Sequence, residues 1–300
     1  MHNLIRNLCT CLILSTATQV YATNALVLQT DFGLKDGAVS EMKGVAFGID
    51  NQLKIFDLTH EIPAYNIWDA SYRLYQTAAY WPQGTVFVSV VDPGVGTNRK
   101  SVVLKTKTGQ YFVSPDNGSL TLVAQKFGIE SIREINESVN RLTGSAGSYT
   151  FHGRDVYAYT GARLAAGVIT FNQVGPELPK QIISIPYQKP EIINNELLGN
   201  IPILDIQYGN VWSNINAESL QQIKVKTGDI LCVQIKQGNT IKYSGKAPYV
   251  NSFDDVADKK PLIYVNSLMN VSIALNMANF SVTHRVYSGP DWSIAVKKCQ

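Results

Sequence analysis

The sequence feature that most constrains the fold is a short apolar run that ends in an acid and glycines, and it occurs twice. Residues 87–91 are apolar and mostly β-branched, which is typical of a buried strand, and Asp92, a proline and two glycines then allow a tight turn. Residues 25–29 form a similar run before Asp31, and apolar residues at helical spacing follow over 38–49. This order of strand, acidic turn and helix predicts an α/β sheet with carboxylates at the ends of parallel strands, where such sheets bind ligands.

Each of these acids also has a simpler explanation. Arg99 follows Asp92 by seven residues, so the two could form an ion pair on the surface of a charged turn. Asp31 could cap the helix that begins near residue 38, but Asp36 lies closer to that helix start and is the better candidate for the cap. Asp31 is therefore left free for a ligand group such as a ribose diol.

The chain divides into two regions that differ in their predicted secondary structure. Strands and helices alternate in the first region, with further strands predicted over 53–58, 86–91, 101–105 and 111–114, and helices over 67–80, 120–127 and 156–166. Short β-type runs predominate in the second, over 201–206, 223–225, 230–235, 240–243 and 262–265, with one helix over 271–279. We therefore predict a Rossmann-like α/β domain over 25–187, a linker over 188–199 and a smaller, mostly β, barrel-like domain over 200–300.

Residues 1–22 have the character of an export signal. A weakly basic start precedes a largely apolar stretch, and small residues allow cleavage after Ala22. We therefore expect a signal peptide and an exported protein, periplasmic or secreted, without a membrane-spanning segment; the alternative is a buried element of a cytosolic protein. Only Cys232 and Cys299 would remain after cleavage, and the sequence leaves open whether they form a disulfide.

Charge and motif content argue against two classes of protein. The formal net charge is only +3 and no run of lysine or arginine marks a nucleic-acid-binding face. The sequence has no CxxC, HxxxH or HExxH pattern, so we expect no metal site.

Three ring side chains in predicted loops or turns have two interpretations each. His152 precedes a predicted helix, whose free amides favour a bound anion or a polar nucleophile, but a histidine there can also simply cap the helix. Tyr65 could stack on a ligand ring, although packing in the core or at its rim is the more frequent role. His60 could likewise contact a ligand, but we expect a structural hydrogen bond.

Polar residues also gather at strand ends in the second region. Asp205 and Asn210 form one cluster, and Asn266 and Ser267 form another. Such side chains can bind an amino acid or the edge of an adenine, but they are also ordinary turn formers.

Seven stretches occur in the order in which one enzyme family carries them. They are TDFGLKDG (30–37), DLTHEIP (57–63), VDPGVGTNR (91–99), PDNGSLT (115–121), FHGRD (151–155), DIQYGNVWSNI (205–215) and YVNS (264–267). The chain thus resembles the S-adenosyl-L-methionine (SAM) hydroxide adenosyltransferases, also called SAM hydrolases, which are relatives of the SAM-dependent fluorinase and chlorinase. The resemblance extends from about residue 26 to the YVNS region.

The resemblance implies a fold, an assembly and a reaction. It implies an N-terminal α/β domain, a C-terminal β domain and a homotrimer in which each active site lies between one subunit's N-terminal domain and its neighbour's C-terminal domain. It implies hydrolysis of SAM to adenosine and L-methionine without a metal or organic cofactor. The catalytic residues it implies are Asp92, Arg99 and His152. The substrate-binding residues it implies are Asp31, Tyr65, Gly153, Asp205, Asn210, Asn266 and Ser267.

These residue types suit that reaction. The sulfonium of SAM is already a good leaving group, so the main need is an oxygen nucleophile held in line with C5′. Asp92 would orient a water and take its proton, Arg99 would stabilise negative charge, and His152 would complete the hydrogen bonds of the water or carry the proton. Two alternatives are a non-catalytic binder of SAM or adenosine with the same fold, and a halide-dependent adenosyl transferase. The presence of all three catalytic residues favours the hydrolase.

Overall fold

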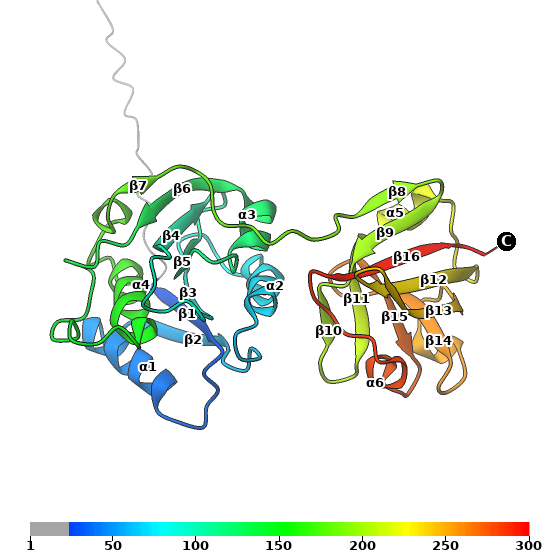
Figure 1. Cartoon of the computed structure of the whole chain (residues 1–300), viewed down its shortest axis with the longest axis horizontal. Helices are drawn as coiled ribbons and strands as arrows, with labels where there is room; N and C mark the ends of the chain where they lie inside the picture. The colour runs from blue at the N-terminus through cyan, green and yellow to red at the C-terminus, as the bar shows by residue number, and fades with distance from the viewer. Residues whose placement is uncertain (1–23, 300) are drawn as a thin grey trace, which may run out of the picture.

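The computed structural model describes residues 24–299, which form two lobes connected by an irregular segment (Figure 1). The first lobe contains one seven-stranded sheet and the second contains a four-stranded and a five-stranded sheet. This arrangement confirms the predicted fold class, an α/β lobe followed by a smaller, mostly β lobe.

The sheet of the first lobe has the strand order β2-β1-β3-β5-β4-β6-β7. Its strands are β1 (Ala25–Thr30), β2 (Lys54–Thr59), β3 (Val86–Val90), β4 (Ser101–Thr106), β5 (Tyr111–Pro115), β6 (Ile129–Glu134) and β7 (Glu177–Leu178). The first four in spatial order are parallel and the remaining pairings are antiparallel. The central strands β1 and β3 are buried along their whole length, which explains why both read as continuous apolar runs.

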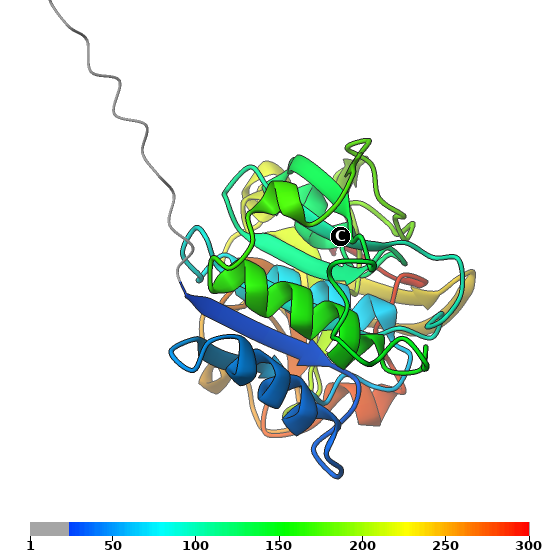
Figure 2. The same cartoon turned by 90° about the vertical axis from the view of Figure 1, so that its left-hand side faces the viewer.

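Helices cover both faces of this sheet. They are α1 (Ala38–Ile49), α2 (Ile67–Ala78), α3 (Thr121–Phe127) and α4 (Tyr159–Ala165). Helices α1 and α4 share a hydrophobic core with alternate residues of β1 such as Leu26 and Leu28, and Figure 2 shows both helices on the near side of that strand. Helices α2 and α3 pack with Val27, which points to the other face.

The second lobe consists of antiparallel sheets that enclose one hydrophobic core. The four-stranded sheet comprises β10 (Ile203–Asp205), β11 (Asn210–Asn216), β15 (Asn270–Leu275) and β14 (Pro261–Val265). The five-stranded sheet comprises β13 (Thr240–Pro248), β12 (Ile230–Gln237), β16 (Trp292–Lys298), β9 (Glu196–Asn200) and β8 (Glu191–Ile193). Two short helices, α5 (Glu218–Gln222) and α6 (Phe280–His284), lie at their edges.

Two predicted elements of this region are wrong, and the predicted linker contains regular structure. The helix predicted over 271–279 is strand β15 for most of its length, because every residue of β15 is buried between β11 and β14 and a short apolar run has no diagnostic periodicity. The strand predicted over 223–225 is a turn after α5. The stretch predicted as a linker contains the hairpin β8–β9, whose tight turn uses Asn194 and Asn195 at φ 52° and 60°.

The predicted signal peptide and periplasmic location are corrected. Residues 1–22 lie outside the described residues, and none of the helices between residues 24 and 299 is long and apolar enough to cross a membrane. Nothing in the described part of the chain supports a signal peptide or a periplasmic protein. We therefore withdraw both assignments.

The structure settles the pairing of Cys232 and Cys299, which form a disulfide. Cys232 lies on β12 and Cys299 directly follows β16, and these two strands are hydrogen-bonded neighbours. The bond closes a loop with a sequence separation of 67 residues, so it restricts the unfolded chain considerably.

We predict that Cys232→Ala lowers the free energy of unfolding by roughly 2–4 kcal/mol because the unfolded chain gains entropy. Urea denaturation followed by circular dichroism measures the change. Adding a reductant should lower the free energy of unfolding of the wild-type protein by a similar amount. The stability of the variant should not change when the reductant is added. A wild-type midpoint that does not respond to reduction would contradict the prediction.

Candidate active site

Two carboxylates meet at the carboxyl edge of the parallel strands in the first lobe. Strands β1 and β3 are parallel neighbours in which Thr30 is paired with Val90, so Asp31 and Asp92 emerge side by side just beyond the last paired residues. They line a pocket of about 270 Å³. Its other lining residues are Phe32, Ala64, Tyr65, Val90, Val95, Thr150, Phe151, His152 and Gly153.

Asp92 and Arg99 form a buried, two-pronged ion pair. The Arg99 Nε donates to Asp92 Oδ1 at 2.8 Å and its Nη2 donates to Oδ2, while only 4% of the Asp92 side chain and 11% of the Arg99 side chain are exposed. The explanation as a surface ion pair is therefore wrong. Arg99 Nη1 donates to Ser101 Oγ at 3.0 Å, which anchors the guanidinium to strand β4.

His152 lies at the start of a continuous helical stretch, a π-helix over Gly153–Ala158 that runs into α4. Its side chain is almost fully buried and makes no capping hydrogen bond, so the explanation as a simple helix cap is wrong. Burial lowers the pKa of His152 below its usual value, and the positive charges of Arg99 and Arg141 lower it further, against the opposite effect of Glu137 and Asp92. The imidazole is therefore neutral at pH 7.

Asp31 and Tyr65 are joined directly. The backbone N–H of Tyr65 donates to Asp31 Oδ2 at 2.8 Å, in a loop where Tyr65 has a left-handed φ of 68°. This conformation turns the ring outward, and 73% of Tyr65 is exposed, so it is not a core residue. Asp36 accepts a hydrogen bond from the N–H of Ala38 just before α1, but the N-cap residue of that helix is Gly37 and no side chain caps it, so neither Asp36 nor Asp31 is the cap.

His60 has the structural role predicted for it. It is buried, its Nδ1 lies 2.8 Å from Thr30 Oγ1, and its Nε2 lies 3.0 Å from Asp57 Oδ1. These contacts connect the ends of β1 and β2 beneath the site.

The predicted residues of the second lobe line a different pocket, of about 780 Å³. Asn210 donates to Asp205 Oδ2 at 3.3 Å, and Ser267 lies on the same wall. Asn266 lines the pocket too, but its amide already bonds the N–H groups of Leu268 and Asn270 and the hydroxyl of Ser272, so its side chain chiefly shapes the turn. The two pockets have no lining residue in common, so one chain does not bring the two sets together.

Sequence reasoning missed several residues of these pockets. Phe32 and Phe151 form an edge-to-face pair with ring centroids 5.8 Å apart at the floor beside Gly153, and Trp212 and Tyr264 line the pocket of the second lobe. Phe151 belongs to the FHGRD motif and could have been found there. Arg141, which contacts His152, lies in an irregular stretch without periodicity and gave no local signal.

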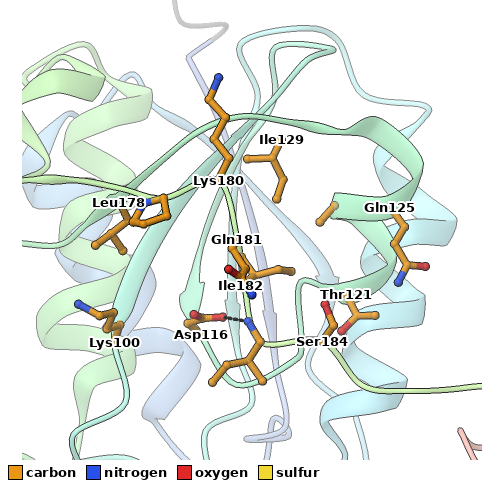
Figure 3. Close-up of a pocket in the computed structure, with 13 residues that line it drawn as sticks. Lys100, Asp116, Thr121, Gln125, Ile129, Leu178, Lys180, Gln181, Ile182 and Ser184 are labelled. Atoms are coloured by element: carbon orange, nitrogen blue, oxygen red, sulfur yellow. Dashed lines mark hydrogen bonds between the residues drawn. The ribbon is translucent and has the colours of Figure 1, made fainter.

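A further pocket of about 760 Å³ lies away from these residues, between α3 and the segment after β7 (Figure 3). Two of its charged groups already have protein partners. Asp116 accepts a hydrogen bond from the N–H of Ile183 at 2.9 Å, and Lys100 pairs with Glu134. We therefore assign it no part in the site. Between residues 24 and 299 we find no cluster of three histidine, cysteine or acidic side chains that could hold a metal ion.

Fold and site together define a two-lobed α/β protein with a buried ion pair at the ligand-binding edge of its parallel strands. Residues 26–175 match the SAM hydroxide adenosyltransferase N-terminal domain and residues 199–293 match the corresponding C-terminal domain. The chain belongs to the SAM hydroxide adenosyltransferase family.

Individual relatives agree with this assignment. A protein of Methanocaldococcus jannaschii named (R)-S-adenosyl-L-methionine hydrolase is 36% identical over 232 residues, which cover 76% of this chain and 80% of that protein. A fluorinase of Actinopolyspora mzabensis is 24% identical over 294 residues, covering 90% and 96%. The crystal structure of an uncharacterized conserved protein from Thermotoga maritima superimposes with a TM-score of 0.81 at 36% identity, covering 91% of this chain and all of that one.

Gly153 is tightly packed, and this generates a prediction. A Cβ at this position would lie 3.1 Å from the ring of Phe32 and 3.2 Å from that of Phe151. We predict that Gly153→Ala destabilises the protein by about 1–3 kcal/mol through overpacking. The matched control is Gly48→Ala in α1, where a Cβ would meet nothing within 4 Å and alanine should be neutral or stabilising. Calorimetry measures both, and an unaffected Gly153→Ala variant would contradict the packing argument.

Proposed function

We propose that this protein hydrolyses SAM to adenosine and L-methionine. The observation that carries the proposal is the pocket in which the buried Asp92–Arg99 pair, His152 and the strand-end Asp31 lie together. The name of the relative from M. jannaschii, (R)-S-adenosyl-L-methionine hydrolase, supports the same reaction.

The proposed catalytic roles follow from the contacts. Arg99 holds both oxygens of Asp92 in one orientation, yet each carboxylate oxygen retains a lone pair that can accept a hydrogen bond from water. A water held in this way is positioned for in-line attack on C5′, opposite the sulfonium, and positioning of this kind accounts for much of the rate of such reactions. His152 contributes a second hydrogen bond from the other side of the pocket.

The substrate-binding roles divide between the lobes. Asp31 would accept hydrogen bonds from the ribose hydroxyls, the exposed ring of Tyr65 would stack on a flat group of the substrate, and Gly153 would contact the substrate beside His152. In the second lobe, the ligand-binding residues would be Asp205, Asn210, Asn266 and Ser267.

A homotrimer with active sites between subunits explains why these sets lie apart. Each lobe has half of a site, and the rim of the second-lobe pocket has exposed apolar side chains that suit a protein contact. They include Tyr208, 64% exposed, and Met277, 82% exposed. The neighbouring subunit's first lobe would cover this pocket and complete the site.

A halide-dependent adenosyl transfer is the second candidate, because the fluorinase of A. mzabensis is also a relative. The intact set of Asp92, Arg99 and His152 favours water over halide. If the protein used halide, 5′-halogenated adenosine would form only when chloride or fluoride is supplied. If the protein were a non-catalytic binder, SAM or adenosine would raise its melting temperature without any turnover.

We predict that the protein incubated with SAM in chloride-free buffer releases equal amounts of adenosine and methionine, measured by chromatography. Asp92→Asn should lower kcat by roughly 100-fold or more because an amide can still accept a hydrogen bond from the water but cannot take its proton. Asp36→Asn is the matched control, because it makes the same change outside the pocket and asparagine can still accept the hydrogen bond from the N–H of Ala38. Near-normal turnover by Asp92→Asn would remove Asp92 from the mechanism.

We predict that subunit mixing restores activity to two inactive variants. Asp92→Asn impairs the first-lobe half of the site, and Asp205→Ala impairs the second-lobe half. Co-expressed in equal amounts, they should regain roughly a quarter of wild-type activity, since a quarter of the sites in randomly mixed trimers combine two intact halves. If each site instead lay within one chain, no mixed assembly would contain an intact site and activity would stay at the level of the variants alone.

A further inference from the structure

One arginine outside the predicted site is held firmly against His152. Arg141 Nη2 lies 2.9 Å from His152 Nε2, and only 9% of the Arg141 side chain is exposed. Glu137 Oε2 accepts from Arg141 Nε at 3.1 Å and from Nη2 at 2.5 Å. The guanidinium also lies over the ring of Tyr149, 5.0 Å from its centroid. These contacts leave Arg141 one orientation, with its Nη2 directed at the imidazole.

The chemistry of this contact determines where the imidazole carries its proton. A guanidinium is always charged and has only donors, so Arg141 must donate and His152 Nε2 must accept. A neutral imidazole with Nε2 as the acceptor carries its hydrogen on Nδ1. Glu137 does not reverse this, because its nearest oxygen is 3.7 Å from Nε2, beyond hydrogen-bond distance, and is already bonded to Arg141.

The other nitrogen of the ring is available to a ligand. His152 Nδ1 is buried and has no hydrogen-bond partner within residues 24–299, and His152 lines the pocket that contains Asp92. A buried N–H without a partner is costly, so a site that maintains one gains when a bound molecule supplies an acceptor.

We propose that Arg141, held by Glu137, is a positioning residue that fixes His152 as the neutral Nδ1–H tautomer, so that His152 donates a hydrogen bond to the attacking oxygen. This inference rests on the proposed function and deepens it, because it determines which residue takes the proton. With Nδ1 protonated and Nε2 occupied by Arg141, the imidazole has no free basic nitrogen.

The proton therefore goes to Asp92. The water oxygen forms a bond to C5′ as the bond between C5′ and sulfur breaks, and the electron pair of that bond stays on sulfur as the thioether of methionine. The oxygen, now bonded to carbon and still carrying two hydrogens, is strongly acidic and loses one proton to the carboxylate of Asp92, which passes it to solvent. A carboxylate is basic enough for this step because the proton leaves as or after the new bond forms.

Nitrogen NMR of the imidazoles tests the tautomer without any need for turnover. The chain has four histidines, so the signals of His152 are those that disappear in His152→Gln. In wild-type protein labelled with ¹⁵N-histidine, long-range ¹H–¹⁵N spectra at pH 7 should show Nδ1 protonated and Nε2 unprotonated. A protonated Nε2 or an imidazolium at pH 7 would overturn the inference.

Variants at Arg141 test the cause. In Arg141→Met the two tautomers of His152 should both be populated. The pKa of His152 should rise, because one positive charge is lost while the negative charges of Glu137 and Asp92 remain. Among the groups that shift this pKa, Arg99 would then be the one remaining cation. In this proposal His152 acts as the neutral imidazole, so the acid limb of kcat against pH should move to higher pH, with kcat at pH 7 lower by roughly tenfold and KM little changed. Arg141→Lys keeps a donor and should restore the Nδ1–H tautomer.

Arg163→Met is the matched control. Arg163 donates to the carbonyl of Val139 and to Asn140 Oδ1, so it anchors the same loop without contacting His152, and its pH profile should remain that of the wild type. Normal hydrolysis with an Nε2–H tautomer would refute the inference and leave the proposed function intact. The Nδ1–H tautomer in a protein that does not turn over SAM would refute the proposed function instead.

Discussion

The parallel pairing of β1 with β3 is the constraint from which the site follows. Hydrogen bonding of Thr30 opposite Val90 leaves the next residues of both strands at one sheet edge, and both strands continue into acids. Helices on both faces bury these strands completely, so their register cannot slip without exposing apolar side chains. The core of the lobe therefore determines the position of Asp31 relative to Asp92. The loops that also line the pocket do not determine it.

Burial then determines how strongly the ionisable groups at this edge interact and which of them stay neutral. An exposed Asp–Arg pair would contribute little to the free energy of folding. Asp92 and Arg99, however, are almost fully removed from water, and each oxygen of the carboxylate accepts a hydrogen bond from the guanidinium. His152, buried beside them and beside Arg141, is kept neutral by desolvation and by two positive charges. The pocket therefore combines a fixed anion, a fixed cation and a neutral imidazole, a set of groups that can orient water rather than remove its proton in advance.

The two lobes are joined through a defined contact as well as through the chain. Trp68 on α2 donates from its indole N–H to the carbonyl of Pro202 at 2.8 Å, and its ring packs against Tyr187 with centroids 5.0 Å apart. This contact lies on the α2 side of the first lobe and includes no residue of the Asp92 pocket. It therefore connects the lobes without covering that pocket.

The strand–acid–turn units, the helices α1 and α2 and the lobe types could be predicted from the sequence, because strand burial, helical spacing and glycine turns are local properties of the chain. Its family motifs also predicted Asp92, Arg99 and His152 as the catalytic residues. Tertiary structure alone decided three things. Strand β15 depends on burial between two partner strands, the disulfide depends on β12 lying beside β16, and the contact of Arg141 with His152 depends on an irregular loop folded over the sheet edge. Each joins residues through packing that no local pattern encodes.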